Sequence, residues 1–285
     1  MSKVLSVVIA LVAAVAGYAA LWQGSGTLLW VRGRFDAQAS TTVPVLLLVL
    51  GSLLVAGAAL TVRLSRLGPI VVGALSLAFS LTLTLTPASS GGDATLLRLV
   101  LAWDSPPVLT IGSGAILTTY LGLLFVLGFA FLALGFFARE RPPGGAVARI
   151  ASALCAVAVI ALTASVFWFG VGVYQTKLAI MTDAPLGQAL QLVQAALIVA
   201  ALVVLRWSSI VALASGAVLT VVGLAGIFAT RPGLPLPSYV ILLSGSPAIA
   251  GICLLGVGFG ALLRARRTPV QQAVAPRARP GVDGL

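Results

Sequence analysis

The residue types that most often carry enzyme chemistry are few and scattered in this sequence. It contains no histidine and only six acidic residues. These are Asp36, Asp93, Asp104, Glu140, Asp183 and Asp283, all in predicted loops or in the C-terminal tail. Because histidine is the usual general base and a common metal ligand, its absence removes most catalytic schemes. We therefore expect no catalytic residue, no cofactor and no metal site.

One arrangement could still support a reaction. Asp93 and Asp104 flank Arg98 in one predicted outer loop, where they could meet as a carboxylate pair beside a cation. Loop carboxylates are usually just solvated, so a membrane enzyme ranks last among the functions considered. The two cysteines, Cys155 and Cys253, are too few for a zinc site and lie at different predicted depths. We expect both to be packing residues rather than a disulfide.

Three arginines are candidates for contacts with anions at the outer face. Arg32 and Arg34 follow Trp22, a tryptophan of the kind that anchors a chain at the lipid head groups. Arg98 lies in the apolar stretch 94–103, which is too short to cross a bilayer and is expected in the outer interface or as a re-entrant segment. Each guanidinium could hold a phosphate or carboxylate, or simply reach the head groups.

Two polar stripes lie within the apolar segments. The first repeats every four residues, on one face of a predicted helix, and consists of Ser76, Ser80 and Thr84. The second repeats every three residues and consists of Gln188, Gln191 and Gln194. Side chains of this kind either tie helices together in lipid or line a polar path or ligand pocket. Both interpretations stay open at this stage.

A small-residue motif occurs near the end of the last apolar segment. Gly256 and Gly260 are four residues apart, the spacing that lets two helices approach closely. The contact could be internal, or it could be with a helix of another protein. The motif is weak in a chain with 31 glycines.

These side chains must be positioned by membrane-spanning helices. The chain has 285 residues, of which 60% are hydrophobic and only 8% charged, and its mean hydropathy is +1.15. That leaves too little polar surface to cover a water-soluble globule. The net charge of +11 would suggest nucleic-acid binding in a soluble domain, but here the basic residues lie between apolar runs. We expect a lipid bilayer as the surroundings and no nucleic-acid partner.

The sequence predicts an all-α polytopic bundle of about eight spans. Most of the apolar runs reach the roughly 20 residues that cross about 30 Å of hydrocarbon. They are Val4–Leu21, Val43–Val62, Gly68–Leu85, Ala115–Ala138, Ile150–Val173, Ala189–Leu205, Ser209–Ala229 and Pro247–Leu263. A cleaved signal is the alternative for the first run, and we favour a retained span. We expect Ser105 and Pro106 to start the fourth span, and 239–243 to be a second interfacial segment.

The basic residues orient these spans. With the N-terminus in the cytoplasm, 12 lysines and arginines fall inside and 5 outside, which places both termini in the cytoplasm of an inner (plasma) membrane. Arg264, Arg266 and Arg267 begin the C-terminal tail. We expect the tail, residues 268–285, to be disordered and to contact anionic lipid.

Sparse matches between the two halves predict a parallel duplication of a four-helix unit. Trp-x-Gly-x-Gly occurs at 22–26 and again at 168–172, where we expect it to close the first and fifth spans. Arg63 and Arg206 end corresponding spans, and Gly73 and Gly216 follow them at the same offset. The predicted units are 1–141 and 150–267, joined by a cytoplasmic linker at 142–149.

These observations leave two functions ahead of the membrane enzyme considered above. The favoured one is a non-enzymatic subunit, accessory protein or scaffold of an envelope or transport complex, with a membrane-protein partner or a second copy beside it. The alternative is a transporter or channel for an uncharged or lipidic substrate, with its path between the two halves and the polar stripes as lining. A continuous polar cavity would favour transport, whereas a packed centre with an apolar external groove would favour a partner.

Overall fold

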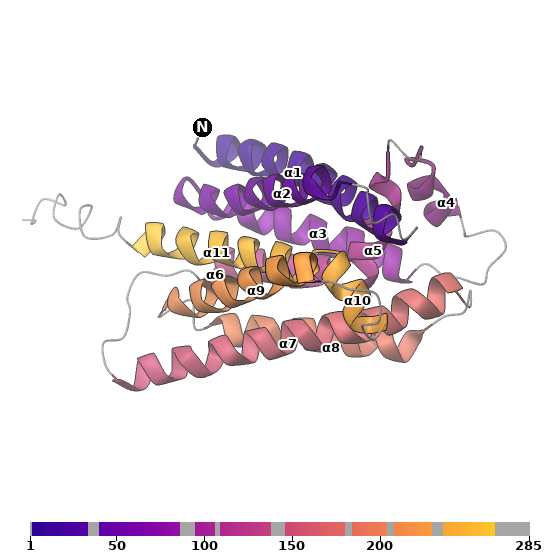
Figure 1. Cartoon of the computed structure of the whole chain (residues 1–285). Helices are drawn as coiled ribbons and strands as arrows, with labels where there is room; N and C mark the ends of the chain where they lie inside the picture. The colour runs from indigo at the N-terminus through magenta and orange to yellow at the C-terminus, as the bar shows by residue number, and fades with distance from the viewer. Residues whose placement is uncertain are drawn as a thin grey trace, which may run out of the picture.

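The computed structural model describes residues 2–33, 40–85, 95–105, 109–137, 146–179, 184–203, 208–229 and 236–265 (Figure 1). Within these ranges every named element is helical, and the only β feature is an isolated bridge between Ser105 and Leu109. Seven helices are long and apolar enough to cross a membrane, and a bent pair of helices makes an eighth if it counts as one crossing. The all-helical membrane class is therefore confirmed.

The first half of the chain contains α1 Ser2–Gly33, α2 Thr42–Leu60, the 3-10 turn η1 Thr61–Arg63, α3 Leu67–Leu85, α4 Thr95–Leu101, α5 Ile111–Tyr120 and α6 Leu123–Phe137. The second half contains α7 Ala146–Ala179, α8 Pro185–Leu202, α9 Ile210–Ala229, α10 Leu236–Leu243 and α11 Ser246–Ala265. Helices α2, α3, α8, α9 and α11 lie within a few residues of their predicted spans. Uninterrupted apolar runs of about the required length are sufficient to locate such helices.

The first and fifth spans are much longer than the sequence predicts. Helix α1 has 32 residues and α7 has 34, so each continues through the Trp-x-Gly-x-Gly motif that was expected to close it. The first glycine of each motif lies against neighbouring backbone instead: a Cβ on Gly24 would be 2.8 Å from the Pro44 carbonyl oxygen, and one on Gly170 would be 2.6 Å from Leu121 Cα. Close helix packing, rather than chain termination, explains these two glycines, whereas Gly172 has nothing within 4 Å of its Cβ position.

The prediction of one continuous fourth span is wrong. Helices α5 and α6 meet at an angle of 71°, with Leu121 and Gly122 between them. Gly122 has φ 82°, a left-handed conformation that a residue with a side chain rarely adopts. The apolar run is uninterrupted in sequence, but this one residue ends the first helix and starts the next in a new direction.

The start predicted for this span is also wrong. Helix α5 begins at Ile111 rather than at Ser105, because Asp104 caps it from outside. The Asp104 carboxylate accepts hydrogen bonds from the backbone N–H groups of Gly112 and Ser113, at 2.6 and 2.9 Å, and from the Ser113 hydroxyl. A carboxylate at a helix N-terminus satisfies free N–H groups and suits the helix dipole.

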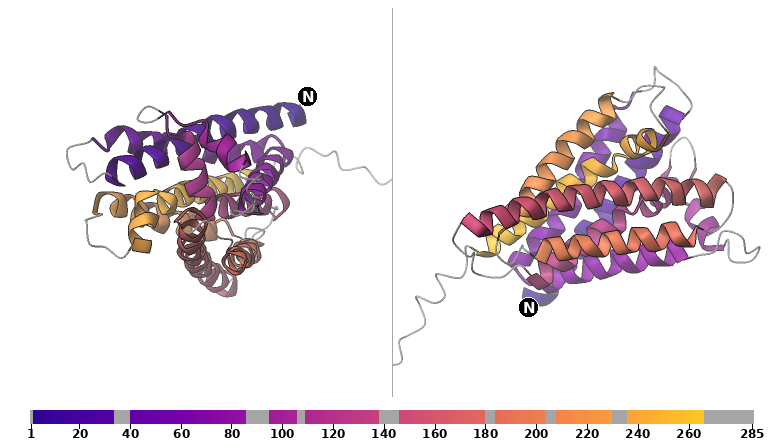
Figure 2. Two further views of the ribbon diagram at one scale, coloured as in Figure 1. Left: turned by 90° about the vertical axis from the view of Figure 1, so that its right-hand side faces the viewer. Right: turned by 90° about the horizontal axis from the view of Figure 1, so that it is seen from below.

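The bundle has two distinct ends. One, the basic end, carries Ser2, Arg63 and Arg66 and the last turn of α11; the other, the α4 end, carries α4, α5, α10 and the last turns of α1 and α7 (Figure 1). Figure 2 shows α1 and α2 on one side of the bundle, α7 and α8 on the opposite side, and α11 between them. Nearly every residue of α6 from Leu123 to Gly135 is buried, and so is most of α11. These two helices form the centre of the apolar core.

Some predictions concern residues outside the described ranges. Arg34, Asp93, the linker residues 142–145 and the tail 268–285 all lie outside them. Helix α7 begins at Ala146, so the end of the predicted linker is already helical.

Candidate functional site

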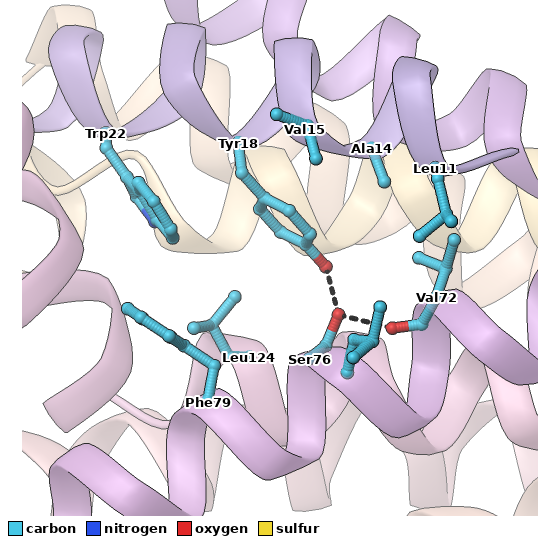
Figure 3. A pocket seen from close by; sticks show the side chains of 10 residues that line it. Leu11, Ala14, Val15, Tyr18, Trp22, Val72, Ser76, Phe79 and Leu124 are labelled. Carbon is cyan, nitrogen blue, oxygen red and sulfur yellow. Dashed lines mark hydrogen bonds between the residues drawn. The ribbon is translucent and has the colours of Figure 1, made fainter. Parts of the chain in front are cut away.

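An apolar groove lies between α1 and α3 (Figure 3). Its volume is about 210 Å³, and it is open at the outer surface, where Val15 and Leu75 of its lining are exposed. Its lining consists of Leu11, Ala14, Val15, Tyr18 and Trp22 from α1, Val72, Leu75, Ser76 and Phe79 from α3, and Leu124 from α6. The exposed surface of this lining is almost entirely apolar. Such a site takes an apolar ligand or segment.

Three aromatic rings form one wall of the groove. Tyr18 and Trp22 are one turn apart on α1, and their ring centroids are 5.7 Å apart in a stacked arrangement. Phe79 from α3 stacks on the other side of Trp22 at 5.3 Å. Stacked rings of this kind hold one another in a fixed orientation. The wall is therefore built from both helices and sets the width of the groove toward the α4 end.

The two hydroxyl groups of the groove bond to each other at its floor. The Tyr18 and Ser76 hydroxyl oxygens are 2.7 Å apart, and the Ser76 hydroxyl is also placed to donate to the Val72 carbonyl at 2.8 Å. If Ser76 donates to Val72, the Tyr18 hydroxyl donates to Ser76 (Figure 3). Because both hydroxyls have partners, neither requires a hydrogen bond from a ligand.

The serine-threonine stripe of α3 is divided among three surroundings. Ser76 lies at the floor of the groove, and the Ser80 hydroxyl is buried without a hydrogen-bond partner. At Thr84, in the last turn of α3, the backbone carbonyl accepts hydrogen bonds from Lys177 at 2.5 Å and from Gln188 at 2.8 Å. The stripe thus meets the glutamine stripe at the α4 end, through Gln188.

The glutamine stripe of α8 ties helices together at the break between α5 and α6. The Gln191 amide is fully buried and donates to the Tyr120 carbonyl at 2.8 Å and to the Val166 carbonyl at 3.3 Å. Tyr120 is the last residue of α5, where the break removes the regular helical partner of the carbonyl. The side-chain oxygens of Gln191 and Gln194 and the Thr163 hydroxyl are buried without a hydrogen-bond partner.

Lys177 is a site residue that the sequence did not reveal. The predicted end of the fifth span at Val173 puts this residue in an outer loop, but α7 extends beyond it and leaves its side chain only 3% exposed. Its ammonium group reaches the Thr84 carbonyl and lies 5.6 Å from the centre of the Tyr120 ring. A cation at a helix C-terminus satisfies a free carbonyl and suits the helix dipole. The burial of Lys177 could have been predicted only by placing the end of α7 beyond Gly172.

Of the acidic residues and arginines considered for catalysis or for anion contacts, Asp104 and Arg98 are those whose side chains the structure describes. Asp104 is engaged as the cap of α5, and Asp93 lies outside the described residues. Arg98 is exposed on α4, while Arg32 is on the last turn of α1, with a side chain outside the described ones. Within the described ranges no group of three His, Cys, Asp or Glu residues could hold a metal ion.

The small-residue motif of α11 lies in an internal contact. A Cβ on Gly256 would be 2.6 Å from the Ala56 Cβ, and one on Gly260 would be 3.0 Å from the Ala59 carbonyl oxygen. Both glycines therefore pack α11 against α2. Of the two contacts open to the motif, the structure contains the internal one.

Comparison with known protein families, with curated proteins and with solved structures finds no match for this chain. The candidate site must therefore be interpreted from its own geometry.

Proposed function

We propose that the chain is a duplicated four-span unit whose two copies pack around a pseudo-twofold axis. The same pairs of helices contact each other in both halves: α1 packs on α2 and α3 on α6, as α7 packs on α8 and α9 on α11. In each half a short helix, α5 or α10, also packs on the long first helix. This correspondence of contacts extends the sparse matches in sequence.

Glycines in corresponding places support the duplication further. Gly122 and Gly245, the described glycines with positive φ, each separate a short helix from the long one that follows. Six residues after each, Gly128 and Gly251 meet the backbones of Gly73 and Gly216. Another seven residues on, Gly135 and Gly258 meet the side chains of Ile70 and Leu213. The three glycines of α5–α6 and those of α10–α11 are related by one constant offset, and their partners on α3 and α9 by another. Chance similarity between apolar sequences does not predict such agreement in contacts.

Contacts between the halves fit the same symmetry. Helix α2 packs on α11, α8 packs on α6, and α6 meets α11 at the centre. With α5 and α6 counted as one crossing, the chain crosses eight times, and the first turn of α1 and the last turn of α11 both lie at the basic end. The positive-inside rule then assigns the basic end to the cytoplasm of the inner membrane. Four crossings per unit give the two units the same orientation.

The function proposed is that of a non-enzymatic accessory subunit or scaffold in an envelope or transport complex. The observation that carries it is the closed centre: Phe131, Leu134, Leu254 and Val257 are each no more than 1% exposed, and they fill the space where the halves meet. A packed centre beside an open lateral groove favours a protein that acts through its outer surface.

A crosslinking experiment in native membranes tests this function. A photoreactive amino acid is placed at Leu197, which is 49% exposed on α8, and at the buried Leu202 on the same helix as a control. We expect the first position alone to give one crosslinked membrane protein, which also copurifies with the full chain in a fixed ratio. A chain that purifies alone, and that crosslinks only to lipid at Leu197, would overturn the accessory function.

Transport remains the second candidate because of the broken helices. Interrupted helices in corresponding places of two repeats are typical of transporter binding sites, and α5–α6 and α10–α11 are both interrupted at a glycine. Here the freed carbonyls already have protein partners, since Gln191 binds Tyr120 and the Ser25 hydroxyl donates to the Ser244 carbonyl at 2.9 Å. Flux of a solute into vesicles that contain the purified chain alone would favour transport.

A further inference from the structure

The groove between α1 and α3 has the form of a slot for a hydrocarbon chain. Its lining extends from Leu11 to Trp22, which is about 16 Å along the axis of α1, and its volume is about 210 Å³. An apolar cavity of about 150 Å³ already accepts a molecule such as benzene. A flexible hydrocarbon chain fits both the length and the volume.

The slot is specific to the first half of the molecule. At the offsets that relate Trp22 to Trp168 and Gly73 to Gly216, the floor pair Tyr18 and Ser76 corresponds to Ala164 and Leu219. Leu219 is buried in the core of the second half. The same helix pairing thus exists without the tyrosine-serine floor, so the floor is not needed for the fold.

The α4 end of the slot offers a place for a charged head group. Trp22 and Phe79 pack against a buried cluster that also contains Val100 of α4, and α4 lies at the same end of the bundle as this end of the groove (Figure 1). Arg98 is on the same helix and is exposed. Asp104 is engaged as the cap of α5, so its charge is already met by N–H groups. Positive charge beside an apolar slot is complementary to an anionic amphiphile.

We propose that this groove holds one acyl chain of an anionic phospholipid of the bilayer, with its phosphate at Arg98. The Tyr18–Ser76 pair forms the floor against which the acyl chain lies. The rings of Trp22 and Phe79 enclose the part of the acyl chain nearest the α4 end. The membrane supplies such lipids without any partner, so this site does not depend on the accessory function.

Native mass spectrometry of the purified full chain tests the site. Phosphatidylglycerol is the probe, and phosphatidylcholine with the same acyl chains is the neutral comparison. We expect one phosphatidylglycerol to be retained per chain, and Val15→Trp, which fills the slot from its exposed rim, to lower its affinity about tenfold. Val12→Trp is the matched control, because Val12 is exposed on the same helix and does not line the groove.

A second pair of variants tests the head-group contact. Arg98→Gln should lower the preference for phosphatidylglycerol over phosphatidylcholine about fivefold, whereas Arg63→Gln, at the basic end, should leave it unchanged. Leu75→Trp, on the opposite rim, replaces Val15→Trp if that variant does not fold. Equal retention of lipid by the slot-filling variant and its control would overturn the proposal. So would a lipid preference that is unchanged in Arg98→Gln.

Discussion

The interface of α1 with α2 and that of α7 with α8 correspond under the proposed duplication but are built from different side chains. In the first, Gly17 and Gly51 bring two backbones together: a Cβ on Gly51 would be 2.7 Å from the Gly17 carbonyl oxygen. At the corresponding offsets the second interface has Thr163 and Gln194. Leu48, which lies against Gly245, likewise corresponds to Gln191, which lies against Gly122.

This difference shows that a similar arrangement of two helices can be built from different interface side chains. Glycines fix the distance between helices where two backbones touch, and a similar helix pair forms where larger polar residues stand at the corresponding offsets. The first interface is close, whereas the second contains buried oxygens of Thr163, Gln191 and Gln194 that have no partner. The two interfaces should therefore differ in their response to substitution.

The largest effect is expected in the close interface. Gly51→Val places two methyl groups where the α1 backbone already lies, so we expect a loss of about 3 kcal/mol or more in the free energy of unfolding. Gly57→Val on the same helix is the control, because a Cβ at Gly57 has nothing within 4 Å. The measurement is thermal unfolding in mild detergent. Equal stability of the two variants would show that backbone contact does not hold α1 on α2.

A smaller loss is expected in the polar interface. Gln191→Leu introduces the residue found at the corresponding position 48, and it leaves the Tyr120 and Val166 carbonyls without their side-chain donor. We expect it to lower the free energy of unfolding by about 1 to 3 kcal/mol. Gln194→Leu, one turn further along the stripe, should cost less than this because its buried oxygen has no partner to lose. A larger loss at Gln194 would point to a bound polar ligand there.

The smallest effect has the opposite sign. Thr163→Val keeps the shape of the side chain and removes a buried hydroxyl that has no partner. We expect the free energy of unfolding to rise by up to about 1 kcal/mol, measured against Thr176→Val, whose hydroxyl donates to the Gly172 carbonyl. Destabilisation by Thr163→Val would instead show that the hydroxyl is satisfied in the membrane, by water or by a ligand.

The sequence is informative about helices and uninformative about their contacts. Long apolar runs locate α2, α3, α8, α9 and α11, because crossing hydrocarbon demands such runs. The ends of α1 and α7 could not be predicted, since a glycine that contacts a neighbouring helix is identical in sequence to one that ends a helix. The break at Gly122 was hidden for the same reason, in a chain with 31 glycines.

The candidate site was found only in part. Helical spacing identifies Ser76, but its partner Tyr18 is 58 residues away on another helix, and no local pattern connects them. Arg98 was identified as a candidate from its apolar neighbours, whereas the burial of Lys177 depended on a helix end that the sequence did not show. Contacts between side chains on different helices can be predicted only when the packing of the helices is known, and no single segment specifies that packing.

The two helices that form the groove, α1 and α3, differ in length relative to the bilayer. With 19 residues, α3 is about 28 Å long and matches the hydrocarbon, whereas α1, with 32, is about 48 Å long and exceeds it. A helix that is too long for its bilayer tilts or thickens the lipid around it, and one that matches does neither. A change in bilayer thickness therefore acts on α3, which starts from a match, and on α1, which starts from an excess, so the two walls of the groove meet the same change differently.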